Sequence, residues 1–334
     1  MIQAASHSPL PDSDRRSDKI LDLVSDEMRL VEAALVTRLD SSVGAIPEVG
    51  AHLLHAGGKR LRPLLSVLVA RACDVSIELA VAVGTAAELI HTATLYHDDV
   101  VDDGRVRRGR PAARMVYGNG IVVLVGDFCL ARALETVALT GSLPAVQSLA
   151  ATVTEMAEGE VAQLERAGNP EATVDDYLRV IDRKTASLFA WCARVGGTLP
   201  PATDAALARY GRAVGRAFQI TDDVLDCAAD ETTAGKSVGQ DIQEGKLTLP
   251  ILYGCEADPA LRALVRGKLG ERAISPEDAA GILTATLAAG GVDRARARAR
   301  ELAAGAVAEL GVLRPSPYRQ ALIDVAALSV DRKF

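Results

Sequence analysis

The chain has 334 residues and a formal net charge of −7, and its 49% hydrophobic content is enough for a large buried core. Only 3% of its residues are aromatic, and Ala, Leu and Val supply most of the hydrophobicity, which favours closely packed helices over a sheet sandwich. The negative charge argues against a general nucleic-acid-binding protein, because such a protein needs a broad basic face.

The N-terminal segment and the cysteines indicate the limits of the domain and the cellular compartment. Residues 1–17 are polar, contain several Ser and Pro residues, and lack the apolar core of a signal peptide. We therefore expect a flexible N-terminal tail followed by a single domain over residues 18–334. The five cysteines include no CxxC pair and mostly stand in apolar runs, which is typical of buried thiols in a reducing cytoplasm.

Helical periodicity runs through nearly every segment between the Gly and Pro breaks. In chain order, the predicted helices cover residues 19–39, 61–73, 77–101, 121–139, 143–166, 174–195 and 203–229, and shorter helices follow residue 249. No segment shows a convincing β-strand alternation, and no repeat of solenoid length is present. The sequence therefore predicts an all-α domain whose central helices are buried.

The most apolar of these helices is predicted to lie in the core and not in a membrane. Its run from Ile77 to Tyr96 is interrupted by Glu78, Glu88 and His91. Ionisable side chains are costly inside a bilayer, and so we predict no transmembrane segment.

Two acidic motifs lie on otherwise apolar helices. Asp98–Asp102 has the sequence DDVVD, and Asp222–Asp226 has the sequence DDVLD. On a helix, residues four apart share a face, with their Cβ atoms about 5–6 Å apart, so the outer aspartates of each motif point the same way. Burying such a pair costs several kcal/mol unless a cation lies near the carboxylates.

The donor atoms of these motifs favour magnesium. Oxygen ligands without His or Cys select a hard cation, and Mg²⁺ usually takes one or two carboxylates and completes its shell with water and phosphate oxygens. A single acidic motif is equally typical of a solvated helix face. Two motifs, each on an apolar helix, favour a metal site over that alternative.

Basic residues gather in four segments around the two motifs. GGKRLRP precedes the first motif, DRKTA lies in a later helix, and GKSVGQDIQEGK follows the second motif. Four arginines come directly after the first motif: Arg105, Arg107, Arg108 and Arg110. Since guanidinium and ammonium groups bind phosphate oxygens, the sequence predicts a cavity for metal ions and more than one phosphorylated ligand.

Together with GDFCLARA and FQITDDVLD, these segments resemble the trans-isoprenyl diphosphate synthases (polyprenyl synthetases) in order and spacing, from about Gly57 to Pro250. The resemblance implies the isoprenoid synthase fold, in which helices surround a central cavity and the two motifs face each other. It also implies a homodimer that condenses an allylic diphosphate with isopentenyl diphosphate, and about three Mg²⁺ ions that bind with the substrate.

The resemblance assigns roles residue by residue. It implies that six aspartates hold the metal ions: Asp98, Asp99, Asp102, Asp222, Asp223 and Asp226. A second group, in which Lys184 is also catalytic, matches contacts with the allylic diphosphate: Arg107, Lys184, Thr185, Gln219, Lys236 and Lys246. A third group matches contacts with isopentenyl diphosphate: Lys59, Arg62, His91 and Arg108. Asp241 stays open, because it could bind metal through water or cap a helix.

Product length depends on the floor of the cavity beside the helix of residues 77–101. One to two turns before Asp98 stand Ala93 and Thr94, both small, where short-chain members of the family carry a bulky aromatic residue. We therefore expect a long-chain product of C30–C50, as in octaprenyl-type members, and the alternative is a farnesyl or geranylgeranyl diphosphate synthase. Further alternatives are a class I terpene cyclase and a non-catalytic subunit of a heteromeric synthase, although both motifs are intact.

Overall fold

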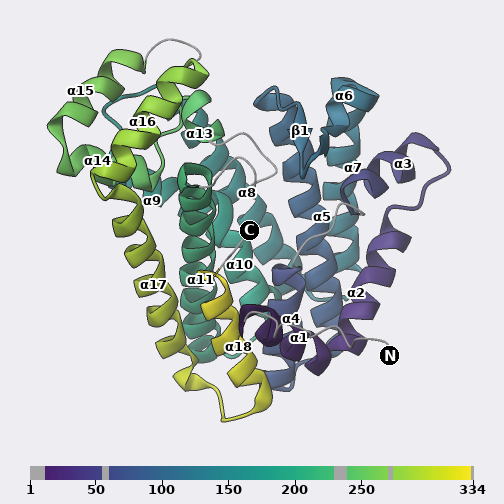
Figure 1. The fold of residues 1–334 in the computed structure, drawn as a ribbon. Coiled ribbons are helices and arrows are strands. Elements are labelled where there is room, and N and C mark those ends of the chain that lie inside the picture. The colour runs from purple at the N-terminus through teal and green to yellow at the C-terminus, as the bar shows by residue number, and fades with distance from the viewer. Residues whose placement is uncertain (1–11, 55–59, 229–238, 270–273, 332–334) are drawn as a thin grey trace, which may run out of the picture.

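The structure, a computed structural model, describes residues 12–54, 60–228, 239–269 and 274–331, and these ranges are almost entirely helical (Figure 1). The helices up to the second acidic motif are α1 (Asp12–Leu23), α2 (Ser25–Arg38), α3 (Ala45–Leu54), α4 (Leu61–Cys73), α5 (Ile77–Val101), α6 (Ala113–Tyr117), α7 (Asn119–Ala138), α8 (Leu143–Arg166), α9 (Val174–Ile181), α10 (Ser187–Ala193) and α11 (Pro201–Ala228). The later helices are α13 (Gln240–Gln243), α14 (Leu249–Ala257), α15 (Pro259–Lys268), α16 (Pro276–Ala288), α17 (Gly291–Glu309) and α18 (Pro317–Leu328). The prediction of an all-α fold is confirmed.

The predicted helix limits agree closely for α4, α5 and α8, but two predicted helices are divided. The segment 19–39 breaks at Val24, whose φ of −131° and ψ of 27° lie outside the helical region. Helix α1 begins at Asp12, so the last residues of the predicted tail are part of this helix. The segment 174–195 contains α9, a π-helical turn and α10, because one turn widens where it packs against α8.

One short hairpin corrects the expectation that the chain contains no β structure. β1 (Val106–Arg107) and β2 (Arg110–Pro111) pair in antiparallel fashion after α5. Arg108 and Gly109 join them with φ values of 52° and 72°, the left-handed conformation that a two-residue hairpin turn requires. Strands of two residues are too short to show an alternating pattern, so the periodicity could not indicate them.

The core consists of two clusters of buried side chains. One gathers residues of α2, α4, α5, α7 and α10, and the other gathers residues of α14 to α17 with the end of α11. In the first cluster α5 packs against both α4 and α7 (Figure 1). Gly84 permits the close contact with α4, because a Cβ atom there would lie 2.9 Å from the Cα atom of Pro63. Each fully buried Leu or Phe stabilises such a core by roughly 1.5–3 kcal/mol, so α5 is firmly anchored.

Among the described residues, α5 is the one helix long and apolar enough to cross a membrane. Of its most apolar stretch, 67% is buried inside the protein. Burial between α4 and α7 accounts for its composition, as expected of a core helix. The C-terminal end of this anchored helix carries the first acidic motif.

Candidate active site

A cavity of about 780 Å³ lies among α5, α8, α9, α10 and α11, and its walls differ in chemistry. Nine Asp or Glu residues and five Lys or Arg residues line it together with an apolar surface. Apolar side chains also line the cavity, among them Ile90, Leu95, Leu130, Val153, Leu188 and Phe218. Because acidic groups are in excess, the polar part attracts cations, whereas the apolar part suits a hydrocarbon.

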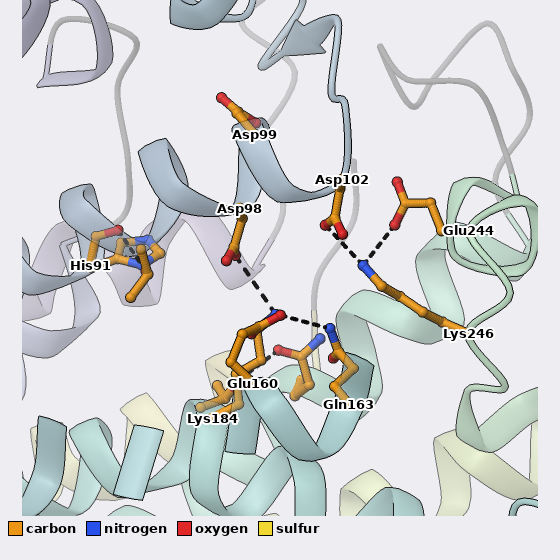
Figure 2. A network of polar contacts seen from close by, with 12 residues as sticks. His91, Asp98, Asp99, Asp102, Glu160, Gln163, Lys184, Glu244 and Lys246 are labelled. Carbon is orange, nitrogen blue, oxygen red and sulfur yellow. Dashed lines mark hydrogen bonds and ion pairs between the residues drawn. The ribbon is translucent and has the colours of Figure 1, made fainter. Parts of the chain in front are cut away.

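Asp98 and Asp102 leave α5 on the same face, and each carboxylate lies close to a lysine from another element (Figure 2). The Asp98 Oδ2 atom is 3.7 Å from the Nζ atom of Lys184. The Asp102 Oδ2 atom accepts a hydrogen bond of 2.9 Å from the Nζ atom of Lys246, which also donates to Glu244 at 2.7 Å. The outer aspartates of the first motif thus share a face, as their spacing predicts.

The charge of Asp98 is only partly compensated. Burial of its carboxylate, opposed by Lys184 and reinforced by Glu160 and Asp102, raises the pKa of Asp98 to about 6. Lys184 is shared with Glu160, whose Oε1 atom also accepts a hydrogen bond of 3.2 Å from Gln163 (Figure 2). A cation beside such a carboxylate favours its ionised form, so the donor set fits a bound metal ion.

Asp99 points away from the other two aspartates of its motif (Figure 2). Its side chain is 1% exposed, and its Oδ1 atom accepts hydrogen bonds from Arg107, of 2.9 Å from Nε and 2.6 Å from Nη2. Adjacent helical residues are rotated by about 100°, which turns Asp99 off the face that Asp98 occupies. The sequence assigned Asp99 to the metal site, but among the described residues it does not line the cavity and instead holds Arg107 at the cavity edge.

The second motif lies in α11, where Asp222, Asp223 and Asp226 line the same cavity. Asp223 is 4% exposed, and its Oδ2 atom accepts a hydrogen bond of 2.5 Å from the hydroxyl of Tyr177. Its Oδ1 atom accepts one of 2.8 Å from the Nε2 atom of Gln219. Burial, opposed by these two hydrogen bonds and reinforced by Asp222 and Asp226, raises the pKa of Asp223 to about 7.

Asp241 extends this acidic group. It lies in the first turn of α13 and lines the cavity, and its backbone N–H donates to Oδ2 of Asp226 at 3.3 Å. Burial, followed by the charges of Asp223 and Asp226, raises the pKa of Asp241 well above its usual range. The residue before α13 is Gly239, so Asp241 does not cap this helix. The geometry therefore favours a contribution to cation binding.

Lys184 and Thr185 both reach the cavity because they lie in the π-helical turn η1 (Asp182–Ala186). A π turn contains an extra residue and therefore changes which side chains face the cavity. Gly159 of α8 makes room for this turn, since a Cβ atom there would lie 2.6 Å from the backbone nitrogen of Lys184. The predicted continuous helix missed the turn because periodicity over a few residues does not distinguish the two forms.

Of the residues matched to isopentenyl diphosphate, Arg62 and His91 line the cavity. Burial and the nearby arginines, with Arg62 and Arg108 contributing most, lower the pKa of His91 well below its usual range, so that its imidazole is neutral. Arg108 is not among the described residues that line the cavity. Lys59 and Lys236 lie outside the described residues.

The two small residues predicted to set product length lie on different sides of α5. Thr94 lines the cavity, one turn before Asp98 and one turn after Ile90. Ala93 is fully buried in the core and is not among the described residues that line the cavity. The structure thus brings Thr94, but not Ala93, to the wall that a growing hydrocarbon would follow.

Within the described residues, no three Asp, Glu, His or Cys side chains form a ready-made metal site. The oxygen donors instead stand on separate walls, with Asp98 in the last turn of α5, Asp102 directly after it, and Asp222 and Asp226 on α11. This arrangement suits Mg²⁺, which keeps several waters and binds substrate phosphates beside one or two carboxylates. These four residues could hold the metal with a phosphorylated ligand.

Comparison with known proteins agrees with this geometry. The sequence profile of the family described as polyprenyl synthetase matches residues 44–285. This chain belongs to that family. Among its relatives, the octaprenyl diphosphate synthase of Escherichia coli (strain K12) is 40% identical over 94% of this chain and 98% of the relative. The nonaprenyl diphosphate synthase of Mycobacterium tuberculosis is 38% identical over 90% of this chain and 91% of the relative.

Solved structures of polyprenyl synthases share the fold. The polyprenyl synthase from Caulobacter crescentus CB15, complexed with calcium and isoprenyl diphosphate, aligns with a TM-score of 0.90 and 37% identity, and the alignment covers 95% of this chain and 98% of that chain. The decaprenyl diphosphate synthase from Rhodobacter capsulatus aligns with a TM-score of 0.88 and 39% identity, covering 94% of this chain and 98% of that chain. The predicted isoprenoid synthase fold is confirmed.

Among the polar residues of the site that sequence reasoning missed are Glu160, Gln163, Tyr177 and Glu244. Glu160 stands beside the glycine that admits the π turn, and Glu244 stands two residues before Lys246. These two positions in the sequence were the signals that could have identified Glu160 and Glu244 as site residues. Their partners come from other helices, so the local sequence could not reveal what each side chain contacts.

Proposed function

We propose that this chain is a Mg²⁺-dependent prenyltransferase that condenses an allylic diphosphate with isopentenyl diphosphate, head to tail, into a long-chain trans-polyprenyl diphosphate of C30–C50. One observation carries the proposal: aspartates of two motifs in different parts of the chain line one cavity that apolar side chains also line. The names of the octaprenyl and nonaprenyl relatives support the long product.

Charged residues of the cavity and its apolar walls have different roles in the proposed reaction. Mg²⁺ held by Asp98, Asp102, Asp222 and Asp226 would neutralise the diphosphate leaving group. Lys184 and other cations of the polar part bind diphosphate oxygens, and the apolar walls exclude water from the allylic cation that forms. No protein base is assigned, since the released diphosphate can accept the final proton.

The decisive experiment is product analysis. The purified chain would be incubated with Mg²⁺, isopentenyl diphosphate and allylic primers of C10, C15 and C20, and the dephosphorylated products would be separated by chromatography and identified by mass. We expect linear trans products in the C30–C50 range. Products of C15 or C20 would support the short-chain alternative, and cyclic hydrocarbons formed without isopentenyl diphosphate would support a cyclase.

A second candidate is a chain that needs a different subunit for activity. It is supported by a relative named heptaprenyl diphosphate synthase component 2, from Geobacillus stearothermophilus, which is 38% identical over 80% of this chain. Turnover by the purified chain alone would contradict this candidate. Turnover that appears only after a partner is added would support it.

For product length, we propose that Thr94 forms part of the floor. Thr94→Phe would place an aromatic ring in the cavity, and the product should become shorter. Ala93→Phe serves as the comparison, because overfilling a buried site costs about 1–3 kcal/mol of stability without narrowing the cavity. Equal shortening by both variants would contradict this assignment.

We also propose a cytoplasmic homodimer. The five cysteines, all within the described residues, are free thiols, which suits a reducing compartment. Exposed apolar side chains gather on α6 and α7, among them Met115, Val116 and Leu124, and such groups suit a subunit interface. Light scattering after gel filtration should give twice the chain mass, and Leu124→Arg should reduce it; a monomeric wild-type chain would contradict the dimer.

A further inference from the structure

A chain of hydrogen bonds links three helical segments beside the cavity. The hydroxyl of Thr185, in the π turn, donates to Oε1 of Gln219 at 3.0 Å. Gln219 donates from Nε2 to Oδ1 of Asp223 at 2.8 Å, and the hydroxyl of Tyr177 on α9 donates to Oδ2 at 2.5 Å. All four side chains line the cavity.

Both carboxylate oxygens of Asp223 are therefore engaged with protein donors. The residue is 4% exposed, whereas its neighbours Asp222 and Asp226 are half-buried on the same wall. These two hydrogen bonds turn the Asp223 carboxylate towards protein donors on α9 and α11. The geometry separates Asp223 from the other two aspartates of its motif.

The hydrogen bond to Asp223 also fixes the orientation of Gln219. The Oδ1 atom of Asp223 accepts from the amide nitrogen of Gln219, and the amide oxygen accepts from the Thr185 hydroxyl. A flipped amide would set its oxygen against a carboxylate oxygen and would lose the hydrogen bond from Thr185. With the present orientation, the oxygens of Gln219 and Thr185 lie together at the cavity wall.

We propose that Asp223 and Tyr177 are positioning residues, which hold the Gln219 amide oxygen and the Thr185 hydroxyl at the cavity, while Asp222 and Asp226 are the metal-binding carboxylates of the motif. This inference rests on the proposed prenyltransferase function. Oriented oxygen dipoles in a water-poor cavity stabilise positive charge as it develops on the allylic carbon. Their loss should therefore lower kcat more than it raises KM.

The experiment compares Tyr177→Phe and Asp223→Asn with Asp222→Asn. Two properties would be measured: steady-state kcat and KM for both substrates, and Mn²⁺ affinity by electron paramagnetic resonance with inorganic pyrophosphate present. We expect Tyr177→Phe and Asp223→Asn to lower kcat by about 10–100-fold, with KM and Mn²⁺ affinity changed by less than about twofold. Asp222→Asn should weaken Mn²⁺ binding by about tenfold or more.

Tyr210→Phe provides a matched control. The Tyr210 hydroxyl is also buried, and it donates to the backbone oxygen of Leu322 at 2.7 Å, away from the cavity. Removing it should lower thermal stability as much as Tyr177→Phe does, but it should leave kcat unchanged. Equal losses of kcat in both variants would show that lost stability, and not lost positioning, is responsible.

A double-mutant cycle tests whether Tyr177 acts through Gln219. If it does, Tyr177→Phe should have little further effect on kcat in the Gln219→Leu background, because coupled residues are not additive. Additive losses would overturn the inference, as would Mn²⁺ binding weakened by Asp223→Asn as strongly as by Asp222→Asn. Absence of turnover in the wild-type chain would contradict the proposed function, whereas the Mn²⁺ measurement tests the metal assignment without turnover.

Discussion

The aspartate motif of α5 and that of α11 have the same spacing but are compensated by different groups. On α5, each aspartate pairs with a cation from another segment: Asp98 with Lys184, Asp99 with Arg107 and Asp102 with Lys246. On α11, Asp223 is held by the neutral donors Tyr177 and Gln219, and Asp226 accepts a backbone N–H. Two motifs with the same spacing of aspartates therefore have different electrostatic environments.

The difference indicates a division of labour. Both motifs lie near the C-terminal ends of their helices, where the helix dipoles add to the negative potential. Flexible lysine side chains compensate the outer aspartates of the first motif, whereas the neutral donors Tyr177 and Gln219 hold Asp223. The first motif is thus suited to exchange its partners during binding, and the second is suited to orient groups. Four predictions test this contrast.

The largest effect is expected for the outer aspartates that face the cavity. Asp98→Ala and Asp222→Ala should each lower the initial rate by at least about 100-fold, because each removes a carboxylate from the proposed metal site. The rate would be measured with labelled isopentenyl diphosphate, and circular dichroism would verify the fold. Asp103→Ala is the control, since the Asp103 side chain is 85% exposed. A near-normal rate with unchanged Mg²⁺ dependence in either motif would contradict its metal role.

Asp99 should matter for stability. Asp99→Ala leaves the Arg107 guanidinium without its buried partner, and we expect a loss of about 3 kcal/mol in the free energy of unfolding, measured with urea. The Asp103–Arg114 pair, in which the Asp103 side chain is 85% exposed, is the comparison, and Asp103→Ala should change stability by less than about 1 kcal/mol. If Asp99→Ala is as stable as the wild type, this pair does not fix the hairpin.

The raised pKa of Asp98 predicts a pH-dependent stability. Burial raises this pKa from 3.8 to about 6, so the folded chain binds a proton more tightly than the unfolded chain. The stability from this proton is fully present below about pH 4 and is lost as pH rises through 6. Asp98→Asn should therefore be more stable than the wild type at pH 8, by roughly 2 kcal/mol in a chelator, and no more stable at pH 4. An equal difference at both pH values would contradict this titration.

The smallest effect is expected for the lysine that neutralises Asp102 when no metal ion is bound. Burial alone would lower the pKa of Lys246, but Glu244 and Asp102 outweigh it and raise the pKa, so this lysine is charged. Lys246→Met should strengthen Mn²⁺ binding without pyrophosphate by about tenfold, because one cation beside Asp102 is removed. Lys268→Met removes a similar pair, of 2.8 Å, between Lys268 on α15 and Asp278 on α16, and it should leave the Mn²⁺ affinity unchanged. Unchanged affinity in Lys246→Met would show that the lysine does not compete with metal.

Much of the architecture follows from local pattern. Helices α4, α5 and α8 have the limits that apolar periodicity gives, because that pattern depends on a few turns of chain. The acidic motifs could be placed on helices for the same reason. The π turn at Lys184 and the break at Val24 escaped prediction, since each changes the backbone by a single residue within an otherwise helical pattern.

Residue types and spacing were sufficient to indicate an all-α chain with carboxylates and cations suited to metal and diphosphate. Which oxygen faces the cavity was decided by contacts between distant segments. Asp102 meets a lysine 144 positions away, Asp223 meets Tyr177 46 positions away, and Asp99 turns to its own hairpin. Helical spacing sets the direction of a side chain around its own axis, but the partner that fixes its charge and hydrogen bonds is supplied by another helix.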